Sequence, residues 1–483
     1  MSMGSPLEKL YPHLPVWAQN LGLSLYGVAY RQERLGGAFA QYVDGFRARD
    51  RWSAARMQEH TERELRRVLV HAFREVPYYQ HRWQRAGIGQ ADLERMTVAD
   101  LPRLPVTPKQ DLQRAPEDFV ARDVAARHKL RRYQSSGSTG TPVTAICTAE
   151  DHRRFIAARE VRSFGWAGAS VRQPRSMIGG RLVVPRANAG PPFHRYNRAE
   201  RQLYFSAYHI APAHVADYVA AFNRYQPRLL TGYAYAHYLL ARMMNEQGLT
   251  LAYEPAAAVL GSEKLTVAMK RVIQQAFRTR AYEEYGAVEN CVLATECEQG
   301  RLHASPDFGI LEIVDDGGLP VPPEVKGRVL GTSLLSEAQP LIRYEIGDAA
   351  VRSADGCPCG RDHLPVLAEI VGRLEDVVIG PDGRELVRFH WVFLGLPRIR
   401  EGQIIQATLD RITVRLVVTE GYGRAEEQEI RRRFAERLGP LDLRFEVVAA
   451  IPRTENGKFR AVISWLSAAE RLAARRLPVE SLP

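Results

Sequence analysis

The chain has 483 residues, of which 45% are hydrophobic and 25% charged, and its formal net charge is +11. This composition is ordinary for a globular protein and excludes the fibrous and disordered classes. Only seven of the 66 Lys+Arg residues are Lys, and the arginines are spread among acidic residues. A nucleic-acid-binding or membrane-surface protein would cluster its basic residues in runs or on one face, so we expect most of this charge to be solvated surface, with a nucleic-acid partner as the less favoured alternative.

No apolar run reaches 18 residues, so the sequence predicts no transmembrane segment. Residues 11–30 contain no Asp, Glu, Lys or Arg, but prolines and amides interrupt them. We expect a buried N-terminal segment there, and neither a signal peptide nor a membrane span. The five cysteines are too few for a disulfide framework and indicate a reducing, cytoplasmic location.

Residues 50–95 predict helices, because apolar residues recur at helical spacing until Pro77 ends the pattern. From about 130 to 370, strand-like and helical stretches alternate, which is typical of an α/β domain with mainly parallel sheets. After Gly372, short strands surround one helix, and a helical tail follows. The sequence therefore predicts a large α/β domain over 1–372, a hinge over 373–376 and a small α+β domain over 377–483.

A run of glycine and hydroxyl residues, QSSGSTGTP, occupies positions 134–142. Such a run lets backbone N–H and hydroxyl groups converge on phosphate oxygens. It is not a Walker A loop, because no Gly-Lys-Ser/Thr follows. A flexible surface loop explains the same composition, so the run alone does not decide between the two interpretations.

Further motifs, which follow this run along the chain, favour the phosphate-binding interpretation because of their order. They are YEEYGAVE over 282–289, RYEIGD over 343–348, GRLED over 372–376 and PRTENGK over 452–458. In this order they resemble the core motifs of the adenylate-forming superfamily, the acyl-coenzyme A ligases and their relatives. The segments VPYY over 76–79, LPVTPK over 104–109 and GSE over 261–263 resemble its phenylacetate-coenzyme A ligase-like and capsule-biosynthesis CapK-like branch.

The resemblance implies an ATP site. The phosphates would lie on Ser135, Ser136, Gly137, Ser138, Thr139 and Gly140. The adenine and the α-phosphate would border Gly261, Ser262, Glu263, Tyr285 and Gly286. Glu289 would hold Mg²⁺, Asp348 would bind the ribose hydroxyls, and Arg373 would lie nearby. The hinge would fall at Glu375, where the usual residue is Asp, so its hydrogen bonding differs in detail.

Lys458 is the catalytic residue that the resemblance implies. Attack of a carboxylate on the α-phosphate brings two anions together, and a movable cation stabilises that transition state. Lys458 is the only Lys between 327 and 483, in a segment rich in Arg. A solvated loop Lys after a turn-forming Asn-Gly is the alternative.

The resemblance implies two reactions. A carboxylate and ATP would give an acyl-adenylate and pyrophosphate, and the thiol of coenzyme A would then displace AMP while the small domain rotates about the hinge. The acyl pocket would be lined by Tyr208, His209, Tyr233, Tyr235, His237 and Ala287. These aromatic residues fit an aryl or arylacetic acid, although tyrosines at helical spacing are also typical of a core.

A second set of residues suggests a structural metal. Cys297, His303, Cys357 and Cys359 offer three thiolates and one imidazole, which make a tetrahedral Zn²⁺ set. The two halves are far apart in sequence and the Cys-x-Cys gap is narrow, so four unrelated residues are the alternative. His363 is a reserve ligand, and we expect Cys147 and Cys291 to be buried apolar residues.

Other functions remain open at this point. The acceptor could be a carrier-protein thiol or an amine, or the adenylate could be released. The chain could also be a non-catalytic nucleotide-binding homologue, although intact Glu289, Asp348 and Lys458 argue against it. A homodimer is an option that no sequence feature decides.

Overall fold

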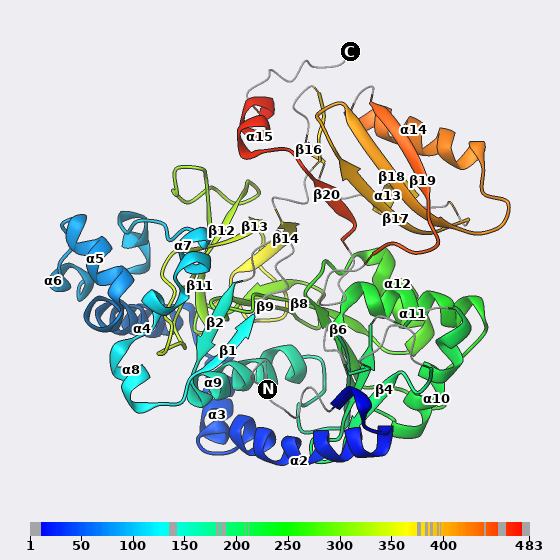
Figure 1. The fold of residues 1–483 in the computed structure, drawn as a ribbon. Coiled ribbons are helices and arrows are strands. Elements are labelled where there is room, and N and C mark those ends of the chain that lie inside the picture. Colours follow the sequence, from blue (N-terminus) through cyan, green and yellow to red (C-terminus); the bar gives the residue numbers. More distant parts are fainter. Residues whose placement is uncertain are drawn as a thin grey trace. The chain divides into compact units, whose positions relative to one another are not determined.

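A computed structural model gives the fold (Figure 1). The structure describes residues 11–134, 143–179, 183–184, 190–207, 209–210, 212–373, 378–381, 385–386, 390–393, 396, 398–438, 441–452 and 460–475. The chain divides into two compact units, residues 1–370 and 371–483. The predicted boundary at 372 lies close to this division, while Glu375 of the predicted hinge is outside the described residues. Within the described ranges, no helix combines the length and the apolar character that crossing a membrane requires.

Helices form most of the first 130 residues. They are η1 (Tyr11–His13), α2 (Val16–Leu35), α3 (Phe39–Arg49), α4 (Ala54–Glu75), α5 (Pro77–Arg85), α6 (Gln90–Leu93), η2 (Val98–Arg103), α7 (Lys109–Arg114), η3 (Pro116–Phe119) and α8 (Arg122–Arg127). Pro77 ends α4 as predicted, but it also begins α5. Proline suits this first helical position because the N–H that it lacks has no partner within the helix.

Helix α2 corrects one expectation. The uncharged N-terminal segment is helical, yet only Gln19, Gly27 and Tyr30 of α2 are buried. Large apolar side chains on its outer face, Trp17 and Leu25 among them, are exposed. The prediction of a buried N-terminal segment is therefore wrong for one face of this helix.

A twelve-stranded sheet is the centre of the first unit. Its strands are β3 (Arg175–Gly179), β4 (His194–Asn197), β5 (Gln202–Ser206), β6 (Leu229–Tyr233), β7 (Ala257–Gly261), β8 (Ala281–Gly286), β9 (Leu293–Glu296), β10 (Leu302–Ala304), β11 (Gly309–Val314), β12 (Lys326–Ser333), β13 (Tyr344–Arg352) and β14 (Val366–Arg373). Their order is β11-β12-β13-β14-β10-β9-β8-β7-β6-β3-β5-β4. A separate hairpin of β1 (Arg131–Gln134) and β2 (Thr144–Cys147) flanks residues 135–142.

The sheet is mixed. Parallel pairing joins β8, β7, β6, β3 and β5, whereas β9, β10, β11, β12 and β4 pair antiparallel with their neighbours. The predicted α/β class is confirmed, and the expectation of mainly parallel sheets holds only for the five-strand segment.

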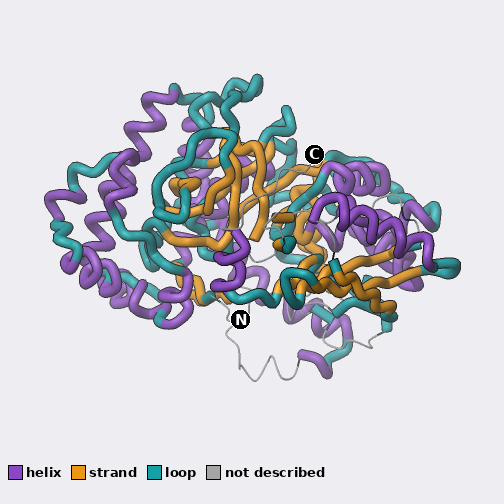
Figure 2. The backbone as a smooth tube through the Cα atoms, turned by 90° about the horizontal axis from the view of Figure 1, so that it is seen from above, coloured by secondary structure: helices purple, strands orange, loops and turns teal. Residues whose placement is uncertain are grey.

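Helices pack on both faces of that parallel segment, and Figure 2 shows the helices of the chain in purple and its strands in orange. Alternate residues of a strand point to opposite faces. On β7, Ala258 and Leu260 face a core built with α10 (Val215–Tyr225), α11 (Ala234–Glu246) and α12 (Val267–Phe277). Ala257 and Val259 face a second core built with α3, α9 (Ala149–Arg159) and η4 (Glu160–Gly165). Burial on both faces explains why these strands are continuously apolar.

The second unit has its own core. Its elements are β15 (Val378–Ile379), β16 (Glu385–Leu386), α13 (His390–Phe393), β17 (Ile399–Gln406), β18 (Arg411–Val418), α14 (Arg424–Leu438), β19 (Asp442–Val447), β20 (Val462–Ser464) and α15 (Ala468–Arg475). A four-stranded sheet in the order β19-β18-β17-β20 packs against α14 through Ile404, Val414 and Phe434. This agrees with the small α+β arrangement that the sequence predicts.

Candidate active site and metal cluster

Several predicted nucleotide residues lie at one edge of the sheet, where β6, β7 and β8 end. Tyr233 pairs with Gly261 across β6 and β7, and Gly261 pairs with Glu284 across β7 and β8. Because these strands are parallel, their carboxyl ends share one edge, and ligands of open α/β sheets bind at such edges. Gly261–Glu263 and Tyr285–Gly286 therefore lie together, as the resemblance implies.

The turn after β7 has a tightly constrained backbone. A Cβ at Gly261 would lie 2.4 Å from the carbonyl oxygen of Glu284, so no larger residue fits. Ser262 has a positive φ of 64°, and the Glu263 carboxylate accepts a 3.0 Å hydrogen bond from the Tyr235 N–H. These contacts fix the turn against the start of α11.

Two tyrosine–carboxylate pairs lie beside this edge. The Tyr285 hydroxyl donates to Oδ2 of Asp348 at 2.8 Å, and the buried Tyr344 hydroxyl donates to Oε1 of Glu289 at 2.8 Å. Tyr344 and Asp348 both belong to β13. Burial, and then the Asp348 carboxylate, raise the pKa of Tyr285 well above its usual value, so its phenol remains a donor. The structure thus groups Tyr285, Glu289 and Asp348, which the resemblance assigns to one nucleotide site.

The Cys291 thiol shows how concentrated the negative charge is here. Its pKa is raised well above the usual value by burial and then by the Glu289 carboxylate. Asp348 also raises the pKa, and Lys109 lowers it. Cys291 is buried, as the sequence predicts for an apolar role.

Lys109 is a residue of this site that no sequence motif singled out as functional. Its Nζ donates to the Ile346 carbonyl at 2.9 Å, and a Cβ at Gly347, the residue before Asp348, would lie 3.5 Å from Nζ. Lys109 thus brings a positive charge to the carboxylates. It ends the LPVTPK segment and is one of only seven lysines, which is the signal that could have identified it.

The predicted acyl-pocket residues differ in their surroundings. His237 is fully buried, donates from Nδ1 to the Tyr233 carbonyl at 2.9 Å, and packs near Phe277. Burial lowers its pKa to about 4, so it is neutral. His209 is also buried, 2.7 Å from Ser206 Oγ through Nδ1. Tyr233, Tyr235 and Ala287 are partly exposed. A substrate pocket made by these residues stays a prediction.

Some predicted residues lie outside the described part of the chain. They are Ser135–Gly140 of the phosphate loop, Tyr208 of the acyl pocket, Glu375 of the hinge and the catalytic Lys458. The backbone of Arg373 is the last of β14. The roles of all these residues stay predictions.

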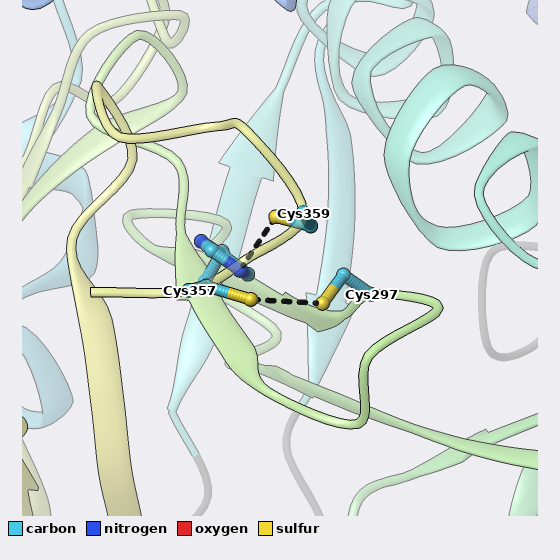
Figure 3. Close-up of side chains that lie close together, drawn as sticks. Cys297, Cys357 and Cys359 are labelled. Atoms are coloured by element: carbon cyan, nitrogen blue, oxygen red, sulfur yellow. Dashed lines mark hydrogen bonds between the residues drawn. The ribbon is translucent and has the colours of Figure 1, made fainter. Parts of the chain in front are cut away.

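The four predicted metal ligands converge in the first unit, and Figure 3 shows the three cysteines of this group. Cys297 and His303 flank the turn between β9 and β10, and Cys357 and Cys359 come from the loop before β14. The ligand atoms of all four lie within 4.8 Å of one another. His363, the reserve ligand, is not part of this group among the described residues.

The distances in this cluster fit Zn²⁺. Cys297 Sγ lies 3.7 Å from Cys357 Sγ, and Cys359 Sγ lies 3.4 Å from His303 Nε2. Tetrahedral zinc with bonds of about 2.3 Å to sulfur and 2.0–2.1 Å to nitrogen requires separations of about 3.8 and 3.6 Å. The other imidazole nitrogen, Nδ1, is 3.1 Å from the Leu364 carbonyl oxygen, a contact that leaves Nε2 for the metal.

Electrostatics and packing also suit a cation at this position. Burial raises the pKa of the Cys357 thiol to about 11, and a bound cation reverses that effect by favouring the thiolate. Burial lowers the pKa of His303, which keeps the imidazole neutral, as a ligand must be. The Gln299 N–H points to Cys297 Sγ at 3.4 Å, and Trp166 packs edge-on against His303.

Comparisons with known proteins show which proteins the chain resembles. A family model described as the CapK C-terminal domain matches residues 379–465. CapK of Staphylococcus aureus is 24% identical over 475 residues, covering 95% of this chain and 99% of its own length. Phenylacetate-coenzyme A ligase of Thermus thermophilus is 27% identical over 437 residues, covering 83% and 95%.

A solved structure shows the same fold. 2-Hydroxyisobutyryl-CoA ligase in its postadenylation state superposes with a TM-score of 0.67 at 22% identity, covering 88% of this chain and 92% of that one. The protein therefore has the fold of an adenylate-forming ligase. Its sequence is similar over most of its length to CapK and to a phenylacetate-coenzyme A ligase, and its C-terminal part matches the CapK C-terminal domain.

Proposed function

We propose that the protein is an AMP-forming acid–thiol ligase, which activates a carboxylic acid with ATP and transfers the acyl group to coenzyme A. The observation that carries this proposal is the group of Tyr285, Glu289 and Asp348 at the carboxyl edge of β7 and β8. Similarity to a phenylacetate-coenzyme A ligase over 83% of this chain supports it.

In the first reaction, a carboxylate oxygen attacks the α-phosphorus of ATP, and the bond to pyrophosphate breaks. Asp348 would accept hydrogen bonds from the ribose hydroxyls, with its carboxylate oriented by Tyr285. Glu289, held by Tyr344, would be a ligand for Mg²⁺, which neutralises phosphate charge when bound. Lys458 and the Ser135–Gly140 loop would bind the reacting phosphates.

In the second reaction, the thiol sulfur attacks the acyl carbon and the bond between that carbon and AMP breaks. The thiol proton leaves with solvent. Rotation of the 377–483 domain about residues 373–376 would replace Lys458 by the thiol-binding face between the reactions. An aryl or arylacetic acid remains the expected substrate class, since the aromatic side chains of Tyr233, at the end of β6, and Tyr235, in the first turn of α11, follow that strand.

Two alternatives differ from this proposal. The first keeps the adenylation reaction, and the second lacks it. Transfer to a carrier-protein thiol or an amine changes only the acceptor. A non-catalytic nucleotide-binding homologue would bind ATP without turnover.

None of the five cysteines forms a disulfide, so the cytoplasm remains the expected compartment.

Pyrophosphate release separates these functions. The purified protein should release pyrophosphate from ATP with one class of aryl acid, and adding coenzyme A should give stoichiometric thioester. Pyrophosphate release that coenzyme A leaves unchanged, with thioester formed on a carrier protein instead, would shift the proposal to that acceptor. Nucleotide binding without pyrophosphate release across aryl and aliphatic acids would contradict the enzyme proposal.

We also propose that Cys297, His303, Cys357 and Cys359 bind one structural Zn²⁺. All four positions are occupied by protein ligands, which is typical of structural and not of catalytic zinc. The ion would join the β9–β10 turn to the loop that leads into β14.

A further inference from the structure

Helix α2 presents an apolar face that the rest of the described chain does not cover. The exposed fractions are 70% for Trp17, 53% for Leu21, 66% for Leu25 and 61% for Val28. The other exposed residues from 17 to 29 are Gly22 and Ala29, so no polar side chain is exposed over this range, and the exposed Gln32 lies one turn beyond Val28. In Figure 1, α2 runs along the margin of the first unit, in blue.

The spacing makes these residues one continuous stripe. Trp17, Leu21, Leu25 and Val28 are separated by four, four and three residues, which places them on one side of a helix. The stripe is about 17 Å long at 1.5 Å per residue. It holds four of the nine large exposed hydrophobic residues in the described part of the chain. Apolar exposure concentrated in this way is typical of an interaction surface.

One flank of the stripe is basic. The backbone N–H of Arg198 donates to Ser24 Oγ at 3.0 Å, and Arg31 donates to the Ala199 carbonyl at 3.1 Å. These bonds hold residues 198–199 alongside α2, with Arg31 and Arg198 both exposed.

The nearby carboxylates do not cancel this charge. Glu200 is buried and forms salt bridges with Arg34 and Arg175, and Glu33 is paired with Arg131. From Val16 to Gln32, α2 itself contains no acidic residue.

We propose that the outer face of α2 docks the protein onto an anionic lipid bilayer. The apolar stripe would enter the boundary between headgroups and acyl chains, and Arg31 and Arg198 would bind lipid phosphates. A tryptophan at one end of the stripe suits this boundary, where an apolar ring with one polar N–H is favoured. A second copy of the chain fits less well, because antiparallel packing of α2 on α2 would bring the two basic flanks together.

Vesicle sedimentation of the full-length protein tests the proposal. The protein should sediment with vesicles of equal parts phosphatidylcholine and phosphatidylglycerol. With vesicles of phosphatidylcholine alone, the amount of protein that sediments should be at least about tenfold lower. The Leu21→Gln/Leu25→Gln variant should lose binding to both, since Gln keeps the helix but removes the apolar stripe. Arg31→Gln/Arg198→Gln should lose only the preference for the anionic vesicles.

A matched control separates this face from general stickiness. Val267→Gln alters a residue that is 66% exposed on another helix, α12, and should bind like the wild type. Circular dichroism confirms that each variant is folded. The proposal is overturned if the wild type does not sediment with either kind of vesicle. It is also overturned if Val267→Gln loses as much vesicle binding as Leu21→Gln/Leu25→Gln. A wild-type dimer that the Leu21→Gln/Leu25→Gln variant converts to monomer also overturns it, since this result would assign the face to a second copy.

Discussion

In the proposed adenylation, a carboxylate approaches a phosphate, and the two anions repel each other. Lys458 is the side chain that we propose to stabilise them. Lys458→Ala should lower acyl-adenylate formation at least about 100-fold, because the transition state loses a cation between two anions. Thioester formation from supplied acyl-adenylate should survive, since that reaction has no negatively charged nucleophile approaching the α-phosphate. Separate assays of pyrophosphate exchange and thioester formation distinguish the two.

Lys326→Ala removes an exposed lysine on β12 and is the control for that experiment. It should leave both reactions at the wild-type rate. Equal loss of both reactions in Lys458→Ala would contradict the assigned role and would indicate a structural one.

A buried ion-pair network at Asp307 gives a second prediction at this scale. Arg162, which is fully buried, donates to both Asp307 oxygens at 2.5 and 3.0 Å, and Arg49 of α3 donates to Oδ2 at 2.6 Å. Asp307→Asn removes the carboxylate that Arg49 and Arg162 share and leaves Arg162 only its 3.1 Å ion pair with Asp50. It should lower the free energy of unfolding by about 3–5 kcal/mol, measured by urea denaturation. Asp44→Asn, at the exposed Arg47 pair, should cost less than about 1 kcal/mol.

The same network predicts how stability depends on pH. Burial alone would raise the pKa of Asp307, but Arg162 and Arg49 lower it from 3.8 to about 2. A carboxyl group with a lower pKa in the folded than in the unfolded state stabilises the fold above its unfolded pKa. That contribution is lost as the pH falls from about 4 to about 2. Over this window the wild type should lose more stability than Asp307→Asn, and parallel curves would contradict the assignment.

At the scale of elements, the cysteine–histidine cluster joins two segments that are remote in sequence. β10 and β14 are paired through His303 and Val366, just beyond the ligand loop. Metal analysis should find about one zinc per chain, and Cys357→Ser should reduce it to less than about one tenth. Cys147→Ser, which alters a buried cysteine outside the cluster, should leave the zinc content unchanged.

The position of any damage tests whether the zinc is structural. In Cys357→Ser, hydrogen exchange should increase at residues 297–303 and 357–366, because the ion no longer joins them. Exchange around the Tyr285–Asp348 hydrogen bond should remain as in the wild type. Loss of adenylation in proportion to zinc, with unchanged exchange elsewhere, would contradict a purely structural ion.

The elements that the sequence predicted well are those in which local pattern and packing agree. β7 is apolar on both faces because both are covered, so its composition alone indicates a buried strand. Pro77 shows the limit of such patterns, since the same residue ends α4 and begins α5. The outer face of α2 could not be foreseen, because residues 16–30 of this helix carry no charge that would mark the side facing solvent.

The site was predicted in the same uneven way. Tyr285, Glu289 and Asp348 were predicted because ordered motifs contain them, and the structure places them close together. Lys109 has no chemical signature of its own, and only the pairing of the Pro105–Lys109 segment with β13 brings it to Gly347. The metal ligands were visible as residue types, but their convergence depends on the β10–β14 register, which no local pattern encodes.

At the scale of the whole molecule, the two proposed reactions require the 377–483 domain to change its orientation, and Gly372 stands where the chain leaves β14. Gly372 has a φ of +99°, and a Cβ at this residue would have no atom within 4 Å, so backbone strain and not a clash opposes a side chain there. Gly372→Ala should strain this conformation by about 1–2 kcal/mol. If the two orientations differ at this residue, the substitution should change the ratio of thioester formation to adenylation severalfold.

Gly248→Ala is the matched control, since Gly248 also has a positive φ and empty surroundings but lies after α11. Gly248→Ala should leave the ratio of thioester formation to adenylation unchanged. If Gly372→Ala has the same ratio as Gly248→Ala, a hinge at Gly372 is contradicted.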